Sequence, residues 1–261
     1  IGLTGDIGLS GALVYVPKGS LSAYKQAAVW KTYTLFETGA KGTTVELMSA
    51  GTLASKLTGV DLGTIQELKV SGPMNTNDFE VIKQMTLLTK VDLSEATMEE
   101  NKLPNYAFSC FANDVEQLMA YLIEVILPEG ITEIGDGAFS YLYQLEKVNI
   151  PTSVERIGSE AFAHCHRFSS LDVSLLTNLK SIGRNAFGGC RSVSSTMQFP
   201  NTLERIGQSA FSGTNVTSVD FSNTALNGVE SYAFSDCAIT GDLSFPATLT
   251  HIGNGAFDAA T

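Results

Sequence analysis

The chain has 261 residues, of which 44% are hydrophobic and 16% are charged, and this composition predicts an ordered protein with a large buried core. Its net charge of −11 argues against a nucleic-acid-binding protein, whose surface would need clustered Lys and Arg. The longest apolar run, Leu118 to Leu127, contains Glu124 and is far shorter than the roughly 20 residues that cross a bilayer, so we expect no membrane span.

Residues 1–40 form the first predicted segment. Within it, Val14–Lys25 has the pattern of a strand followed by a helix. This pair resembles the strand and helix that close arrays of repeats. The sequence starts at Ile1 without Met or a signal peptide, which favours a mature form or an excised fragment. A closing element at the start of the chain suggests that another block of repeats precedes Ile1 in the natural protein, or that this segment docks elsewhere.

Residues 41–121 are predicted to contain degenerate repeats that include helices. Ile65–Gly72 and Leu88–Ser94 alternate as strands do, and Asn77–Met85 between them has the period of an amphipathic helix. Asn113 followed by Glu116 is a helix start, which predicts an extra helical turn over 114–121.

Residues 122–261 contain a regular repeat. Six small-residue and phenylalanine pairs recur at spacings of 23, 25, 24, 23 and 23 residues, and an aliphatic residue stands five positions before each phenylalanine. A period in the low twenties predicts a solenoid whose turns bury their apolar faces by stacking on one another. The phenylalanines are Phe139, Phe162, Phe187, Phe211, Phe234 and Phe257, and Phe108 stands in the same setting further upstream.

One unit shows how the pattern becomes structure. The segment before Pro151 alternates, so Val148 is expected to face inward and Lys147 outward on a half-buried strand that the proline ends. A second short extended piece follows, and Gly158 is expected to adopt a backbone angle that larger residues resist. The phenylalanines of successive units then stack, and each ring buries about 150–250 Å².

The pattern LxxVxIPxSVxxIGxxAFxxC, written out by Leu145–Cys165, resembles the leucine-rich repeats of the BspA-like family of bacterial surface proteins. The resemblance extends over about residues 120–261. It implies an α/β repeat fold, a leucine-rich-repeat solenoid, in which a curved right-handed coil of short parallel strands is completed by short helices or turns. It also implies an exported or surface-anchored bacterial protein that acts in adhesion or protein–protein interaction.

The sequence stops inside a repeat, at Ala256–Thr261. An uncovered solenoid end exposes apolar side chains and unpaired strand groups. We therefore expect either that Val14–Trp30 docks on the end of an array, its own or that of a second chain, or that the C-terminal face meets another copy.

Three of the four cysteines, Cys165, Cys190 and Cys237, stand three residues after a repeat phenylalanine, where other units have Leu, Thr or Ala. This predicts small apolar fillers that are buried and reduced. Cys165 and Cys190 lie in consecutive units, so a bridge between them stays open as an alternative.

Signals for catalysis are absent. The sequence contains no CxxC, GxSxG, HExxH or phosphate-binding glycine loop. His164 and His166 flank Cys165 and are expected to point away from the core. We therefore expect neither an enzyme nor a cofactor or metal site.

The outward side of the strands is the candidate binding face. Aligning the strands places short polar and acidic side chains in two columns, one repeat apart, which suits an extended polymer or a basic patch of a protein. A polar strand face can equally be plain solvated surface. The columns contain Lys90, Glu124, Lys147, Ser170, Thr196, Ser218 and Asp242, and Asp92, Asn149, Asp172, Gln198, Asp220 and Ser244, with Ile126 in the second.

Three functions remain open. The leading one is a secreted or cell-surface module that binds an extracellular or host protein, because aromatic platforms for carbohydrate are missing from both columns. A carbohydrate-capture module is the second, supported by outward aromatic side chains such as Tyr141, Tyr143 or Phe168. A structural spacer within a larger surface protein is the third.

Overall fold

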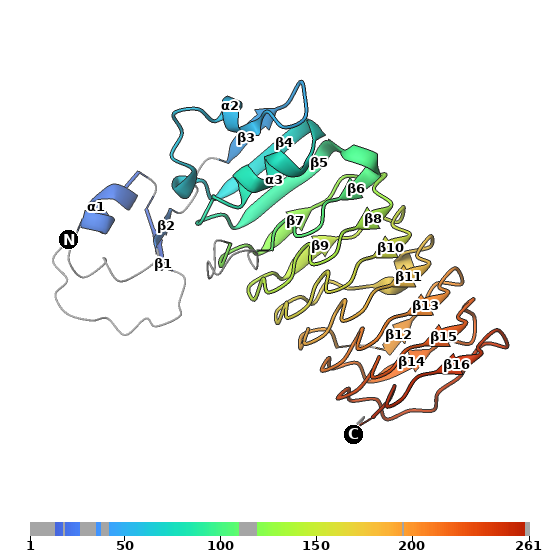
Figure 1. The fold of residues 1–261 in the computed structure, drawn as a ribbon. Coiled ribbons are helices and arrows are strands. Elements are labelled where there is room, and N and C mark those ends of the chain that lie inside the picture. Colours follow the sequence, from blue (N-terminus) through green and yellow to red (C-terminus); the bar gives the residue numbers. More distant parts are fainter. Residues whose placement is uncertain are drawn as a thin grey trace, which may run out of the picture. The chain divides into compact units, whose positions relative to one another are not determined.

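The structure, a computed structural model, describes residues 14–17, 19–26, 35–37, 42–109, 119–194 and 196–258 (Figure 1). It divides into two compact units, Ile1–Thr43 and Thr44–Thr261. In the first unit, β1 (Val14–Val16) pairs in parallel with β2 (Leu35–Glu37), and α1 (Leu21–Gln26) connects them in sequence. The expected strand and helix are therefore both present. Lys18 and residues 27–30 of the expected closing element lie outside the described residues, and its docking stays a prediction.

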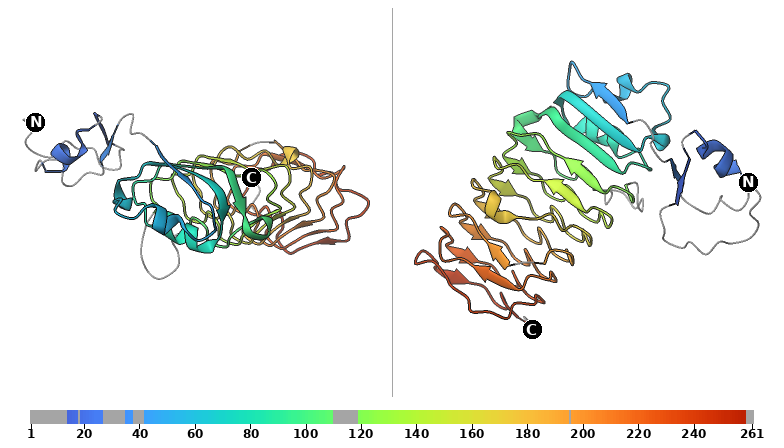
Figure 2. Two further views of the ribbon diagram at one scale, coloured as in Figure 1. Left: turned by 90° about the horizontal axis from the view of Figure 1, so that it is seen from above. Right: turned by 180° about the vertical axis from the view of Figure 1, so that it is seen from behind.

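The second unit is a parallel solenoid of about eight turns. Both views of Figure 2 show successive turns following one another along the solenoid. Each regular turn supplies a segment to each of two ladders. The first ladder contains a five-stranded sheet of β3 (Thr43–Glu46), β4 (Glu67–Met74), β5 (Lys90–Met98), β7 (Glu124–Ile126) and β9 (Lys147–Asn149), and a two-stranded sheet of β12 (Thr196–Gln198) and β14 (Ser218–Asp220). The second ladder is a seven-stranded sheet of β6 (Lys102–Leu103), β8 (Glu133–Ile134), β10 (Arg156–Ile157), β11 (Ser181–Ile182), β13 (Arg205–Ile206), β15 (Gly228–Val229) and β16 (His251–Ile252).

Helices are short and gather in the first turns. They are α2 (Leu53–Lys56) and α3 (Thr76–Ile82), with 3-10 turns η2 (Leu62–Thr64), η3 (Glu99–Asn101) and, further on, η4 (Val173–Leu175). The helix predicted over 77–85 is confirmed with slightly different bounds, and Asn75 and Asp78 form a capping box at its start. Buried Asp78 also accepts the backbone N–H groups of Gly51, at 2.7 Å, and Leu53, at 2.9 Å, and so fastens α2 to α3. Most of the turn expected over 114–121 lies outside the described residues.

The predicted phenylalanine column is present. Successive rings from Phe108 to Phe257 stack with centroids 4.8–5.5 Å apart and interplanar angles of 17° or less. At one end, Phe79 of α3 meets Phe108 edge-on at 5.4 Å. The rings from Phe108 to Phe234 are fully buried, whereas Phe257, expected to be buried as well, is only partly so.

The backbone around each phenylalanine has an alternating conformation that spacing alone does not predict. Residues two before and two after the ring have positive φ in every described case, as Glu160 (56°) and His164 (59°) do around Phe162. The N–H of Phe162 donates to the carbonyl of Ala186 in the next turn at 2.7 Å, and the neighbouring turns repeat this bond. The phenylalanine segments therefore form a third hydrogen-bonded ladder, which holds the rings in register.

The reason expected for Gly158 is wrong. Its φ lies outside the left-handed region, but a Cβ added there would lie 2.7 Å from the backbone N of Asp136 in the preceding turn. Gly183 and Gly207 are equally close to the turns before them. Glycine is required here because consecutive turns approach too closely for any side chain.

The cysteines occupy the small buried slot that the sequence predicts. Cys165, Cys190 and Cys237 are free and buried, and each thiol donates to the carbonyl of the phenylalanine one turn earlier, at 2.9–3.2 Å. Burial raises the pKa of the Cys190 thiol to about 12, and it raises those of Cys165 and Cys237 as well. The protonated thiol thus acts as a hydrogen-bond donor inside the core.

Because these three thiols are free, dithiothreitol is expected to leave the melting temperature unchanged. Calorimetry with and without reductant measures this directly. A fall of several degrees in reductant would show that Cys165 and Cys190 are bridged in solution, since losing a native disulfide typically costs about 2–5 kcal/mol.

Candidate functional site

The structure aligns the two predicted columns of the candidate binding face as neighbouring positions in the first ladder. Lys90, Glu124 and Lys147 are in register across β5, β7 and β9, as are Asp92, Ile126 and Asn149. In the second stretch, Thr196 pairs with Ser218, Gln198 pairs with Asp220, and Asp220 forms an isolated bridge with Ser244. Ser170 and Asp172 lie between the two sheets and belong to neither, and Asp242 is exposed two residues before Ser244.

Two of the predicted face residues serve the fold. The Asn149 amide accepts from the N–H of Leu127 at 2.6 Å and donates to the carbonyl of Leu127 at 3.2 Å. Ser170 Oγ likewise accepts from the N–H of Val148 at 3.2 Å and contacts the Val148 carbonyl at 3.4 Å. Asn149 extends the pairing of β7 with β9 by one residue, and Ser170 bonds to β9 on the side where this sheet has no further strand. Their hydrogen-bonding groups are therefore occupied before any ligand arrives.

Three aspartates of the face form the same turn. Asp92, Asp172 and Asp220 each accept, through Oδ1, the N–H of the serine two residues later, at 2.9–3.1 Å. In this Asx turn the second carboxylate oxygen still points to other partners. Hydrogen bonds from Ser222 hold the pKa of Asp220 below its usual range. Partial burial alone would raise the pKa of Asp92, but the Ser94 hydrogen bonds and nearby lysine charges outweigh it and lower the pKa.

Charge along the face changes from one end to the other. At the N-terminal end, Lys90 Nζ pairs with Glu124 Oε2 at 3.0 Å. At the C-terminal end, the carboxylates of Asp172, Asp220 and Asp242 are exposed, and none has an ion-pair partner among the residues that the structure describes. This end therefore presents three acidic groups whose charge is uncompensated.

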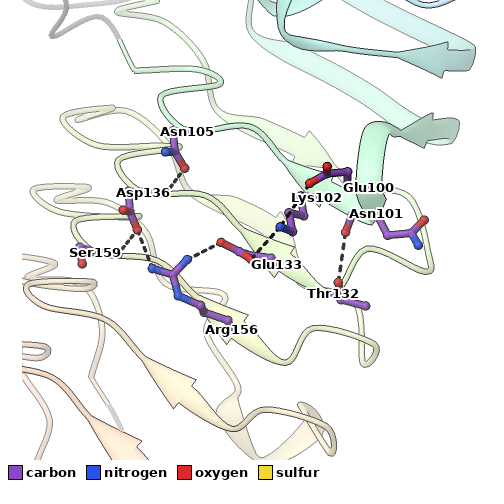
Figure 3. Close-up of polar contacts among 9 residues, drawn as sticks. All are labelled: Glu100, Asn101, Lys102, Asn105, Thr132, Glu133, Asp136, Arg156 and Ser159. Carbon is purple, nitrogen blue, oxygen red and sulfur yellow. Dashed lines mark hydrogen bonds and ion pairs between the residues drawn. The ribbon is translucent and has the colours of Figure 1, made fainter.

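The second ladder is different, because its charges are paired within it, and sequence reasoning missed this surface. Lys102 lies 3.4 Å from Glu100 and 3.8 Å from Glu133, and Arg156 contacts Glu133 and, at 3.0 Å, Asp136 (Figure 3). Further along, Lys180 pairs with Glu155, Arg184 with Glu160 and Arg205 with Glu230. Acidic and basic residues alternate just before the aliphatic residue of each unit, and this alternation was the sequence signal for the ion pairs.

Polar groups near Arg156 also tie adjacent turns together. Asp136 Oδ1 accepts the Ser159 N–H at 2.7 Å, while the Asp136 N–H donates to Asn105 Oδ1 at 2.9 Å (Figure 3). The Thr132 N–H donates to the Asn101 carbonyl at 2.8 Å. These bonds occupy polar groups of the second ladder around Arg156 with contacts between turns.

The aromatic residues suggested for carbohydrate binding do not behave alike. Phe168 is fully buried and stacks on Phe162 at 4.8 Å, so its expected outward position is wrong. It stands three residues before Leu171, as Leu145 stands three before Val148, and that register could have shown it to be a core residue. Tyr143 is 40% exposed and Tyr141 partly so, and both contact histidines of the next turn.

No helix in the described ranges has the length and apolar character to cross a bilayer. Among the same residues, His, Cys, Asp and Glu side chains do not gather in groups of three or more that could hold a metal ion.

Several solved structures of leucine-rich repeat proteins are similar to this chain. A leucine-rich cell surface protein from Faecalibacterium prausnitzii is 24% identical, with a TM-score of 0.49, over 61% of this chain and 40% of that one. A leucine-rich repeat protein from Treponema pallidum is 22% identical, with a TM-score of 0.44, over 63% and 69% of the two chains. One from Bacteroides ovatus is 21% identical, with a TM-score of 0.43, over 76% and 65%.

The chain thus spans less than half of the Faecalibacterium protein. No protein with a curated description matches it. The sequence profile of the BspA type leucine-rich repeat region matches six copies, over residues 65–169, 110–195 and 168–261. These ranges include every turn that contributes to the phenylalanine column. The chain belongs to the BspA-type leucine-rich repeat family.

Proposed function

We propose that this chain is a protein-interaction module of a secreted or cell-surface bacterial protein, in which it acts in adhesion and not as an enzyme. The family is one of repeat proteins, and one similar structure is that of a leucine-rich cell surface protein. The observation that supports a ligand-binding role is the row of uncompensated carboxylates of Asp172, Asp220 and Asp242 on the candidate binding face.

The expected ligand is a basic patch on an extracellular or host protein. Exposed carboxylates spaced one or two turns apart along the face form a field that steers a basic partner and adds to its rate of association. Asp220 is kept ionised by its hydrogen bonds from Ser222, so the charge of this position persists at mildly acidic pH. The paired charges of the second ladder leave little net field there for a partner.

Replacing Asp172, Asp220 and Asp242 together by Asn is expected to weaken ligand binding about tenfold or more, because each lost charge-assisted contact costs about 0.5 kcal/mol or more at an exposed site. Asn retains the oxygen that caps each turn, so the fold should be unchanged. The measurement is surface plasmon resonance with the protein that the wild-type chain captures from an extracellular protein preparation.

The matched control changes the same charge on the second ladder, through Glu155→Gln, Glu160→Gln and Glu204→Gln. Both triple variants raise the net charge from −11 to −8, since each removes three negative charges. The control should bind as the wild type does. Equal weakening by both variants would mean that overall charge, and not this face, governs binding.

A further inference from the structure

A cluster of four rings lies outside both ladders, on the turns that follow Phe139 and Phe162. Tyr141 stacks on His164 with centroids 4.8 Å apart, and Tyr143 lies over His166 at 5.0 Å. The two tyrosines meet edge-on at 6.3 Å, and so do the two histidines at 6.1 Å. All four side chains are partly or largely exposed. Two aromatic stacks thus stand side by side at the surface.

The backbone beneath this cluster is unusual for such residues. Tyr141 has a φ of 62° and His164 a φ of 59°, in the left-handed region that bulky side chains disfavour. The next two turns place Gly189 and Gly213 at the equivalent position, where this conformation costs nothing. The rings therefore stand at a position where the fold by itself prefers glycine.

The two glycines leave a surface without side chains next to the cluster. A Cβ at Gly189 would lie 2.8 Å from His164 Nδ1, so the imidazole leans over this glycine. A Cβ at Gly213 would meet nothing nearer than 3.9 Å, so the space above it is open. Asp236 occupies the same position one turn further on and ends the surface that lacks side chains.

One cation, Arg191, lies beside the cluster in a chain whose net charge is −11. Arg191 occupies the position of Tyr143 and His166 one turn further on, and it forms no ion pair with any residue that the structure describes. Ser192, the residue after Arg191, donates through Oγ to the His166 carbonyl at 2.7 Å, which places Arg191 on the turn next to the histidines. Burial and the charges of Arg191 and His164 hold the pKa of His166 below its usual range. Glu146 lies 3.7 Å from the exposed Arg167 guanidinium and is already engaged there.

We propose that Tyr141, Tyr143, His164, His166 and Arg191 form a binding site for an acidic polysaccharide, whose sugar rings bear carboxylates. Aromatic side chains at a surface pack against the apolar faces of sugars, and the Tyr143 hydroxyl and the imidazole nitrogens are groups that can hydrogen-bond sugar hydroxyls. The planar guanidinium of Arg191 matches a carboxylate with two parallel hydrogen bonds. The tyrosines, the histidines and Arg191 lie on three consecutive turns, which fits an extended ligand that runs along the solenoid.

Calorimetric titration with four oligomers tests this site: hexagalacturonate, a hyaluronan hexasaccharide, maltohexaose and hexaglutamate. The wild-type chain is expected to bind at least one acidic sugar and neither of the other two. Arg191→Gln should weaken that binding about tenfold or more, the scale of a lost charge-assisted hydrogen bond. Tyr143→Ala should weaken it by up to about tenfold, the scale of an aromatic contact.

Lys56→Gln in α2 is the matched control, because it also removes one exposed cation that has no ion pair among the described residues, and it should leave binding unchanged. Melting temperatures show that each variant is folded. Absence of binding to both acidic sugars overturns the proposal. Equal binding of maltohexaose or hexaglutamate also overturns it, since rings alone or charge alone would then suffice. Equal weakening by Lys56→Gln and Arg191→Gln overturns it as well.

Discussion

Replacing Phe187 by Ala is expected to lower the free energy of unfolding by about 3–5 kcal/mol, the usual range for a large buried aromatic residue. Phe187 is fully buried between the rings of Phe162 and Phe211, each with its centroid 5.2 Å away. The cavity should remain open, because both neighbours are fixed by backbone bonds between turns, including that from Phe187 N to the Ala210 carbonyl at 2.8 Å. Urea unfolding followed by circular dichroism measures the loss.

The control for this variant is Leu175→Ala, because Leu175 is 61% exposed in η4 and loses little apolar burial. It should change the free energy of unfolding by no more than about 0.5 kcal/mol. A stacked array can also lose cooperativity when one turn is weakened, so a second unfolding phase is expected for Phe187→Ala alone. An unchanged melting temperature in Phe187→Ala would contradict the buried column.

Gly183→Ala is expected to cost about 3 kcal/mol through overpacking. The new Cβ would lie 2.5 Å from Ser159 N and 2.6 Å from the Gly158 carbonyl carbon. These are backbone atoms of the adjacent turn and cannot rotate away as a flexible side chain would. The turns must therefore move apart, which stretches the bond from the Gly183 N–H to the Ile157 carbonyl, now 2.8 Å long. Thermal unfolding measures the effect.

Gly228→Ala serves as the control, because Gly228 also lies in the second ladder but a Cβ there would meet only His251 Cβ at 3.9 Å. Its φ lies outside the left-handed region as well. Alanine restricts the unfolded chain, so this variant should be neutral or slightly stabilised. Similar losses of stability for Gly183→Ala and Gly228→Ala would show that the close approach of turns does not explain the glycine at position 183.

Regular spacing made the ring column predictable, because the same residue type at a fixed period must return to the same place in each turn. The cause of Gly158 was not predictable, since a sequence does not distinguish a left-handed backbone from a close approach. The outward position predicted for Phe168 was wrong because Phe168 has the register of a core residue. Its distance to Leu171 would have placed it in the core.

The sequence could predict which residues of the candidate binding face point outward. It could not predict which of their side chains are already hydrogen-bonded within the fold. Asn149 and Ser170 bond to the backbone of the preceding turn, a use that depends on where the first ladder is interrupted. The recurring aspartate, apolar residue and serine at Asp92, Asp172 and Asp220 were visible in the sequence as an Asx-turn signature. Ion pairing on the second ladder required the distance between turns.

The central proposal, that the acidic end of the first ladder meets the ligand, is tested most directly by amide hydrogen exchange of the full chain with and without the captured protein. Slower exchange is expected over residues 170–174, 196–198, 218–222 and 242–244, because bound protein would cover these strands and the turns that follow them. Residues 180–184 and 204–208 of the second ladder should exchange as in the free chain. Protection confined to the second ladder, or protection that misses 218–222, would contradict the proposed function.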